Sequence, residues 1–194
     1  GRIEDREDVY TNTMECYDPK TNTWEYKAPY KTSIIRFAAV VGRDDRIYVF
    51  GGGTYERASK TFLVFDNVEV YDPKKDVWTS RKPMPAPRCG HAGVLGNDGM
   101  MYIMGGGVFR GPPLRDVWIY DPVKDTWGKG PKMQVPRSSL AAVSTPDGKI
   151  YAIGGTDVGA YKSRETINFF LPQDYELYQG KVQDTVEVLD ISKP

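Results

Sequence analysis

The sequence has few cysteines, few histidines and no long apolar run. Its 194 residues include 2 Cys and 1 His, too few for a disulfide-rich scaffold or a four-ligand zinc site. No stretch approaches the roughly 20 apolar residues that a membrane-spanning helix requires. Acidic and basic side chains balance at 26 each, so no overall positive field attracts nucleic acid. We predict a protein with no cofactor that binds neither membranes nor nucleic acid.

The two cysteines also bear on the cellular compartment. Cys16 and Cys89 lie far apart in separate predicted strands, and we expect both to be reduced. The sequence contains no N-glycosylation acceptor and no secretory signal, so we expect a cytoplasmic protein. The chain begins with Gly1 and not with Met, which leaves open a targeting segment ahead of it.

Glycine, proline and tyrosine are frequent, at 20, 14 and 13 residues. Glycine and proline in these numbers favour many short strands joined by turns over a bundle of helices. Internal repeats support this prediction. The motif Tyr-Asp-Pro recurs at intervals of 54 and 49 residues, each time with a tryptophan five positions after the proline, and glycine pairs recur at the same intervals. The motifs begin at Tyr17, Tyr71 and Tyr120, and the glycine pairs at Gly51, Gly105 and Gly154.

Each repeat contains four strand candidates. In the clearest repeat they are Arg88 to Leu95, Met101 to Met104, Val117 to Tyr120 and a strand from Trp127 onward. A four-stranded meander of about 50 residues cannot bury both faces alone and has to stack on a neighbour, which is typical of a propeller blade. We expect the tyrosine and tryptophan of each motif to fill the space between blades. Arginines at 36, 88 and 137 precede the first strands and are assigned to the same period.

The combination of a glycine pair with Tyr-Asp-Pro-x-x-(Asn/Asp)-x-Trp resembles the kelch repeat family. The period also agrees with the ~50 residues of kelch repeats rather than the ~40–45 of WD40 repeats. The resemblance implies an all-β fold, a kelch-type β-propeller with about three and a quarter four-stranded blades. The predicted blades are 1–30 (partial), 36–83, 88–134 and 137–191, the last without its fourth strand and with an insertion at 156–184.

Since propellers typically close with 4–8 blades, we expect this chain to be an arc of a larger propeller. The remaining blades would come from the same chain or from a second copy. In this family the loops between second and third strands lie on one face that usually binds partners. Here the expected loops are long, at Gly53 to Asn67, Gly107 to Asp116 and Thr156 to Asp184. The resemblance therefore implies a protein-interaction platform, acting as a substrate receptor or a scaffold.

Arginines near the mouth of similar propellers recognise acidic peptide segments, and the long loops add basic and aromatic residues. The alternative for the arginines is that they bind backbone carbonyls or acidic side chains between blades. The alternative for the 156–184 insertion is that it covers its own blade. The residues predicted to contact a partner are Arg36, Arg57, Arg88, Arg110, Arg115, Arg137, Tyr161, Phe169, Phe170 and Tyr175.

Catalysis has less support in the sequence, and we expect binding rather than enzymatic activity. The copper site of galactose oxidase needs several imidazoles and phenolates, whereas His91 is the single histidine here. We predict that His91 packs in an inner strand or lines the channel. The alternative function is a kelch-type sugar-processing enzyme, similar to sialic-acid epimerases or galactose oxidase, whose active groups lie partly in further blades.

Overall fold

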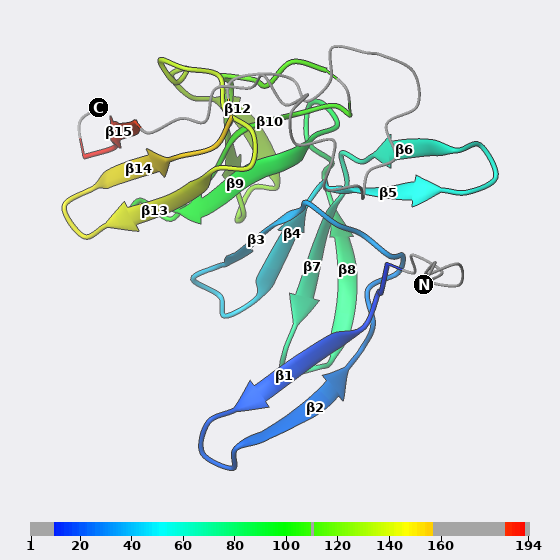
Figure 1. Ribbon diagram of the computed structural model, residues 1–194. Coiled ribbons are helices and arrows are strands. Elements are labelled where there is room, and N and C mark those ends of the chain that lie inside the picture. The colour runs from blue at the N-terminus through cyan, green and yellow to red at the C-terminus, as the bar shows by residue number, and fades with distance from the viewer. Residues whose placement is uncertain (1–9, 110, 157–184, 193–194) are drawn as a thin grey trace.

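The computed structural model describes residues 10–109, 111–156 and 185–192. All regular structure in these ranges is β-strand, as predicted (Figure 1). The first sheet is a hairpin of β1 (Met14–Asp18) and β2 (Thr23–Lys27). The second has the order β3 (Ala38–Val41), β4 (Ile47–Phe50), β7 (Val68–Asp72) and β8 (Val77–Arg81). The third has the order β9 (Cys89–Leu95), β10 (Met101–Gly107), β11 (Val117–Asp121) and β12 (Thr126–Lys129). The fourth contains β13 (Ala141–Thr145), β14 (Lys149–Ile153) and β15 (Val186–Asp190).

Each of these sheets is antiparallel, and its strands follow one another in chain order. In the second, third and fourth sheets, a glycine pair bends the chain at or near the end of the second strand. Gly51 and Gly52 have φ values of 53° and 88°, a left-handed conformation that residues with a Cβ adopt only at a cost. In the third sheet, however, β10 continues through its glycine pair to Gly107, so the pair does not end that strand as expected.

One hairpin was not expected from the sequence. Gly53–Asn67 was predicted to be a loop, but it contains β5 (Gly53–Glu56) and β6 (Thr61–Val64), which pair with each other antiparallel. Figure 1 shows this hairpin projecting sideways from the end of β4. Ile35 joins its base through a bridge to Gly53. The second sheet therefore carries a small sheet of its own in the connection between its second and third strands.

The sheets pack face to face through apolar side chains. One cluster joins the second sheet to the third and includes Phe50, Val68, Ile103 and Tyr120, all fully buried. A second cluster joins the third sheet to the fourth. The innermost strands β3, β9 and β13 lie beside one another in succession. Apolar burial between consecutive sheets is the main stabilising contribution in such a stack.

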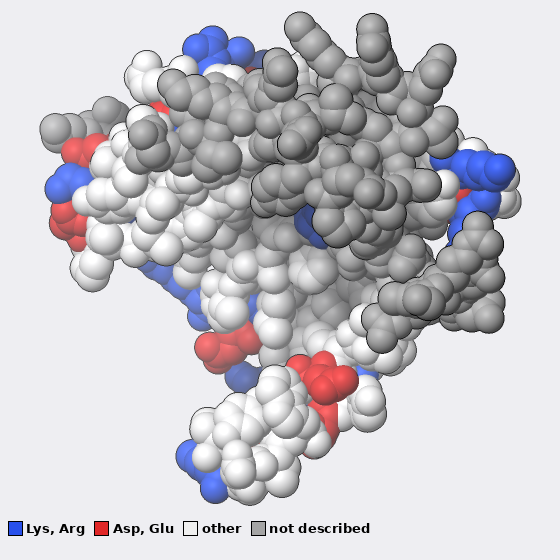
Figure 2. All heavy atoms as spheres, in the orientation of Figure 1, with Lys and Arg blue, Asp and Glu red and all other residues white. Residues whose placement is uncertain are grey.

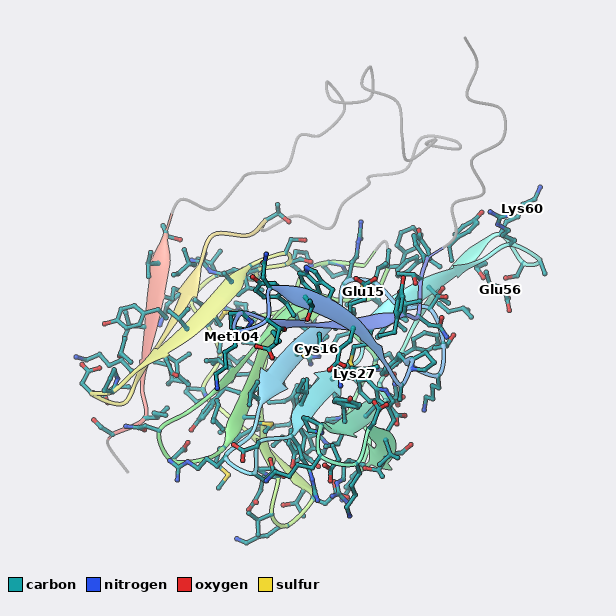
Figure 3. All side chains as sticks on the ribbon, turned by 90° about the horizontal axis from the view of Figure 1, so that it is seen from below. Glu15, Cys16, Lys27, Glu56, Lys60 and Met104 are labelled. Atoms are coloured by element: carbon teal, nitrogen blue, oxygen red, sulfur yellow. The ribbon has the colours of Figure 1, made fainter. Side chains whose placement is uncertain are left out.

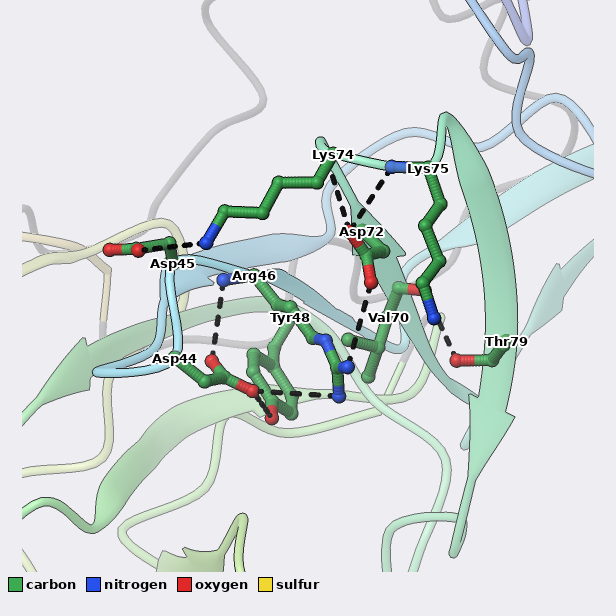
Figure 4. Close-up of polar contacts among 9 residues, drawn as sticks. All are labelled: Asp44, Asp45, Arg46, Tyr48, Val70, Asp72, Lys74, Lys75 and Thr79. Carbon is green, nitrogen blue, oxygen red and sulfur yellow. Dashed lines mark hydrogen bonds and ion pairs between the residues drawn. The ribbon is translucent and has the colours of Figure 1, made fainter.

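Polar side chains fix the turns at the opposite end of the strands from the β5–β6 hairpin. Tyr48 donates its hydroxyl to Asp44 at 2.9 Å, and Tyr102 repeats this contact with Asp98 at 2.7 Å. Arg46 lies between two carboxylates, 3.8 Å from Asp44 and 3.5 Å from an oxygen of Asp72 (Figure 4). The tyrosine contact is made in both the second and the third sheet, and all of these contacts help to hold the turns.

Candidate functional site

The Tyr-Asp-Pro motif ties each sheet to the one before it. Tyr71 donates its hydroxyl to Asp76 at 2.7 Å, and the same carboxylate accepts the N–H of Ala28 at 2.8 Å. Trp78 donates its indole N–H to the carbonyl oxygen of Ala28 at 2.9 Å. We call this set of contacts the clasp. It is made again one sheet later by Tyr120, Asp125, Trp127 and the backbone of Lys82.

The first copy of the motif is only partly engaged. Tyr17 donates to Asn22 at 2.8 Å, as its counterparts do to Asp76 and Asp125. Trp24 is 66% exposed and Tyr26 is 75% exposed, because the structure describes no sheet against this side of β1 and β2. Figure 2 shows the hairpin standing away from the body of the molecule. The fourth sheet likewise exposes Val143, Val186 and Val188.

Two of the predicted partner-contact arginines are buried between sheets. The Arg88 and Arg137 side chains are among the largest that are fully buried. Arg88 donates to the carbonyl oxygen of Gly105 at 3.1 Å. Arg137 donates to the carbonyl oxygen of Gly154 at 2.6 Å and pairs with Glu187 at 3.0 Å. The structure thus shows the alternative geometry, in which these arginines bind backbone carbonyls and a carboxylate.

Arg36 does not occupy the same position as Arg88 and Arg137, so the predicted arginine period was wrong. Gly90 donates its N–H to the carbonyl oxygen of Arg36, and Ser139 donates in the same way to Gly90. All three residues have positive φ, at 59°, 66° and 57° in chain order. Arg36 is therefore equivalent to Gly90 and Ser139, and Ile34 is equivalent to Arg88.

Arg36 belongs instead to an aromatic cluster at the loop end of the sheets. Its guanidinium carbon lies 5.9 Å from the centre of the Phe62 ring, on β6. Phe62 in turn lies 4.8 Å from Phe109, which follows β10. Stacked rings and a cation over a ring each contribute modest attraction beyond their burial. This contact between Phe62 and Phe109 joins the hairpin of one blade to the loop of the next, and the sequence offered no local signal for it.

Exposed apolar side chains surround this cluster. Tyr55, which pairs with Phe62 across the hairpin, is 45% exposed, and Phe37 and Val108 are 43% and 51% exposed. Leu63 pairs with Thr54 and so lies on the other side of the hairpin. Glu56 and Lys60 lie at the outer end of the hairpin, away from the rest of the molecule (Figure 3). We call this surface, with the Arg36, Phe62 and Phe109 cluster, the hairpin face. Exposed apolar patches of this kind often mark interaction sites.

The other predicted contact residues fall in two groups. Arg57 and Arg115 are both exposed at the loop end, and Arg115 donates to the carbonyl oxygen of Gln134 at 3.4 Å. Figure 2 shows Lys and Arg side chains at the outer end of the β5–β6 hairpin, where Arg57 and Lys60 lie. The remaining predicted residues lie outside the described part of the chain: Arg110, Tyr161, Phe169, Phe170 and Tyr175.

His91 and Cys89 are buried at the start of β9. His91 Nε2 lies 3.1 Å from the carbonyl oxygen of Phe50, and this contact requires Nε2 to carry the proton. Burial and the nearby Arg88 lower the pKa of His91 to about 3, so the ring is neutral at pH 7. Burial raises the pKa of the Cys89 thiol, against the effect of Arg36, and both cysteines are free. His91 packs in an inner strand, in agreement with the sequence.

The described residues contain neither a cluster of metal ligands nor a helix that could span a membrane. No three His, Cys, Asp or Glu side chains in these ranges come close enough together to hold a metal ion. None of the described segments forms a helix with the length and apolar character needed to cross a bilayer.

Comparison with known proteins agrees with the repeat and the clasp. A family model described as the KLHDC2/KLHL20/DRC7 Kelch-repeats domain matches residues 1–155. The chain belongs to the kelch-repeat family. Its four-stranded antiparallel sheets are kelch blades, as the resemblance implied, and we refer to the four sheets as the first to fourth blades.

Several kelch proteins are similar over about half of the chain. Kelch repeat and BTB domain-containing protein 12 of Danio rerio is 34% identical over 112 residues, which are 54% of this chain and 18% of that protein. Kelch-like protein 35 of Mus musculus is 36% identical over 110 residues, 55% of this chain and 18% of that protein. Kelch-like protein 15 of Danio rerio is 38% identical over 93 residues, 47% of this chain and 15% of that protein. The chain covers less than a fifth of the length of these relatives.

Proposed function

We propose that these blades are part of a protein-interaction platform that binds a partner through the hairpin face. The observation that carries this proposal is the contact of Phe62 with Phe109 beneath Arg36, surrounded by exposed apolar side chains. Membership of the kelch family supports a role in binding, as a substrate receptor or a scaffold. A cytoplasmic location remains part of the proposal.

The chemistry of the hairpin face suggests the kind of partner. An apolar or aromatic side chain could pack beside Tyr55 and Val108, and basic residues nearby would favour carboxylates on the same segment. We therefore propose a partner with an acidic segment that also carries an apolar anchor. Arg88 and Arg137 contribute by holding the blades beneath this face rather than by touching the partner.

Further blades are proposed to complete the propeller. The exposed Trp24 is equivalent to Trp78 and Trp127, which donate to the backbone of a residue that follows the last strand of the preceding blade. A further blade against β1 and β2 would give Trp24 the same partner and cover Tyr26. That blade would come from the same protein or from a second copy.

The partner proposal can be tested by comparing bound proteins from cells. The full-length natural protein is tagged and purified with its partners, in parallel with a double variant, Tyr55→Ala and Val108→Ala. A matched control, Asp45→Ala and Lys74→Ala, removes a 3.7 Å ion pair at the opposite end of the blades. We expect the first variant to lose a partner that the control retains. Equal retention by both variants would contradict the proposal, provided that both unfold at the temperature of the parent protein.

A further inference from the structure

Arg88 and Arg137 occupy equivalent positions, each just before the first strand of its blade. Gly52 donates its N–H to the carbonyl oxygen of Arg88 at 2.9 Å, and Gly106 donates to that of Arg137 at 2.8 Å. Each guanidinium then reaches a glycine carbonyl of its own blade. The backbone and the guanidinium of Arg88 therefore have the same glycine partners as those of Arg137, and the two arginines are structurally equivalent.

The residue that faces this position differs from blade to blade. The strand register places Glu69 opposite Val49, Trp118 opposite Ile103 and Glu187 opposite Ala152. Val49, Ile103 and Ala152 each lie two residues before a glycine pair. Glu69, Trp118 and Glu187 are therefore equivalent, and the second and fourth blades have a carboxylate where the third blade has an indole.

In the fourth blade the arginine and the carboxylate neutralise each other. Arg137 Nε lies 3.0 Å from Glu187 Oε1. The other guanidinium nitrogens donate to the carbonyl oxygens of Gly154 and Thr185 and to the hydroxyl of Thr185. Glu187 also accepts the N–H of Val135 at 3.1 Å. A buried ion pair with its remaining donors satisfied is the arrangement that makes burial of an arginine tolerable.

In the third blade Arg88 is buried without such a partner. Its one hydrogen bond goes to the carbonyl oxygen of Gly105, and its Nε is buried with no acceptor. Among the described residues no carboxylate lies within ion-pair distance of Arg88. Burial lowers its pKa to about 10, partly offset by Asp116, so the guanidinium is charged at pH 7. A buried charge without a counter-charge is costly.

Two other buried polar atoms without a partner lie on the same face of the third blade. Trp118 faces Ile103 and His91 faces Gly105 across β10, two residues apart, so both side chains point toward the second blade. Trp118 Nε1 and His91 Nδ1 are both buried and unpaired. Arg88 Nε and Trp118 Nε1 are N–H donors that need an acceptor. His91 Nδ1 becomes a third donor when the ring is protonated.

We propose that a small monovalent anion, such as chloride, binds between the second and third blades beside Arg88, in the place that the Glu187 carboxylate takes one blade later. Such an anion would neutralise the buried guanidinium and accept the N–H groups of Arg88 and Trp118. Arg88 is 1% exposed, so a free ion fits this position better than a carboxylate attached to a partner. The site is independent of the hairpin face.

The anion is tested by thermal unfolding of the 194-residue chain in chloride and in gluconate at the same ionic strength. We expect the much larger gluconate ion to be excluded, and the unfolding midpoint to keep rising with the logarithm of the chloride concentration above Kd, by roughly 3–6 °C at ten times Kd. Bromide should act like chloride. The same midpoint in chloride and gluconate would overturn the proposal, because a water molecule at the site would show no preference for chloride.

Two variants identify the position. Trp118→Glu supplies the carboxylate that the fourth blade already has, and we expect it to abolish the chloride dependence. Trp118→Gln removes the same indole without adding charge, and it should retain a chloride dependence. If Trp118→Glu remained as sensitive to chloride as Trp118→Gln, the anion would not lie beside Arg88. Bromide soaked into crystals of the unaltered chain gives an independent readout, since an anomalous peak must appear within hydrogen-bond distance of Arg88 Nε and its absence contradicts the site.

Discussion

Trp78 donates its indole N–H to the carbonyl oxygen of Ala28 at 2.9 Å, and so joins the second blade to the first across 50 residues of chain. Trp24 has the same place in its own motif but is 66% exposed. The two tryptophans thus occupy the same motif position and differ in burial. That difference allows the contribution of the clasp to stability to be measured within one chain.

We expect Trp78→Ala to lower the free energy of unfolding by roughly 2–4 kcal/mol, because it removes a half-buried ring and its hydrogen bond. Trp24→Ala should lower it by less than about 1 kcal/mol in the isolated chain. Urea unfolding followed by far-UV circular dichroism gives both values. Equal losses in the two variants would show that the clasp contributes nothing beyond the ring itself.

Asp76→Asn tests the carboxylate of the clasp. The hydroxyl of Tyr71 and the N–H of Ala28 lower the pKa of Asp76, so its contribution to stability is present above the unfolded pKa of about 3.9 and is lost as pH falls through the lower folded value. The variant should therefore lose less stability than the parent between pH 4 and pH 2. Asn22 already accepts from Tyr17 in the first blade, so the amide fits. Parallel acid-unfolding curves for the two proteins would contradict this role.

His91→Gln tests the buried imidazole. The folded pKa of about 3 lies below the unfolded value of about 6.5. The unfolded chain therefore binds a proton first as pH falls. The contribution of neutral His91 to the free energy of unfolding is fully present above pH 6.5. It is lost as the pH falls below 6.5, by at most roughly 1.4 kcal/mol per pH unit.

Glutamine can still donate to the carbonyl oxygen of Phe50 but does not titrate. We expect His91→Gln to flatten the dependence of unfolding free energy on pH between 6.5 and 4.5. The measurement is urea unfolding at several pH values in gluconate buffer, with chloride left out. An unchanged slope would mean that His91 is not the group that titrates.

Arg36→Gly separates strain from binding. Arg36 has φ of 59° where the next blade has Gly90, and a residue with a Cβ is strained in this region. We expect the glycine variant to unfold at the same temperature as the parent or slightly above it, while its affinity for a partner of the hairpin face falls. Ser139→Gly makes the same backbone change one blade later and should leave binding unaltered. Equal binding by both variants would exclude Arg36 from the contact.

The repeat allowed most of the fold to be predicted. Tyr-Asp-Pro marks the end of the third strand and the glycine pair lies at or near the end of the second, so the order of strands in the second and third blades follows from their spacing. The β5–β6 hairpin was missed because Gly53–Asn67 lies between the second and third strands of its repeat, where a loop was expected. The strand-forming residues Thr54 and Tyr55 before a polar turn and Thr61, Phe62 and Val64 after it were a usable signal.

The site was harder to predict. Arg36 lies 52 residues before Arg88, whereas the other markers in these repeats are 54 apart, and this mismatch of two residues could have revealed the wrong assignment. Burial of Arg88 and Arg137 depends on glycine carbonyls 17 residues further along the chain, which no local pattern reports. The contact of Phe62 with Phe109 joins residues of two different blades, so no local pattern predicts it either.

The clasps are directional. Asp76 and Asp125 hold Ala28 and Lys82, residues that follow the last strand of the preceding blade, so each blade is secured by its C-terminal neighbour. The β1–β2 hairpin is therefore joined to the second blade through Ala28. In the described ranges its own Trp24 makes no corresponding hydrogen bond to another blade. Amide hydrogen exchange should then be fastest in β1 and β2, with fraying that advances from the N-terminal hairpin into the stack and stops where the clasp of Trp78 begins.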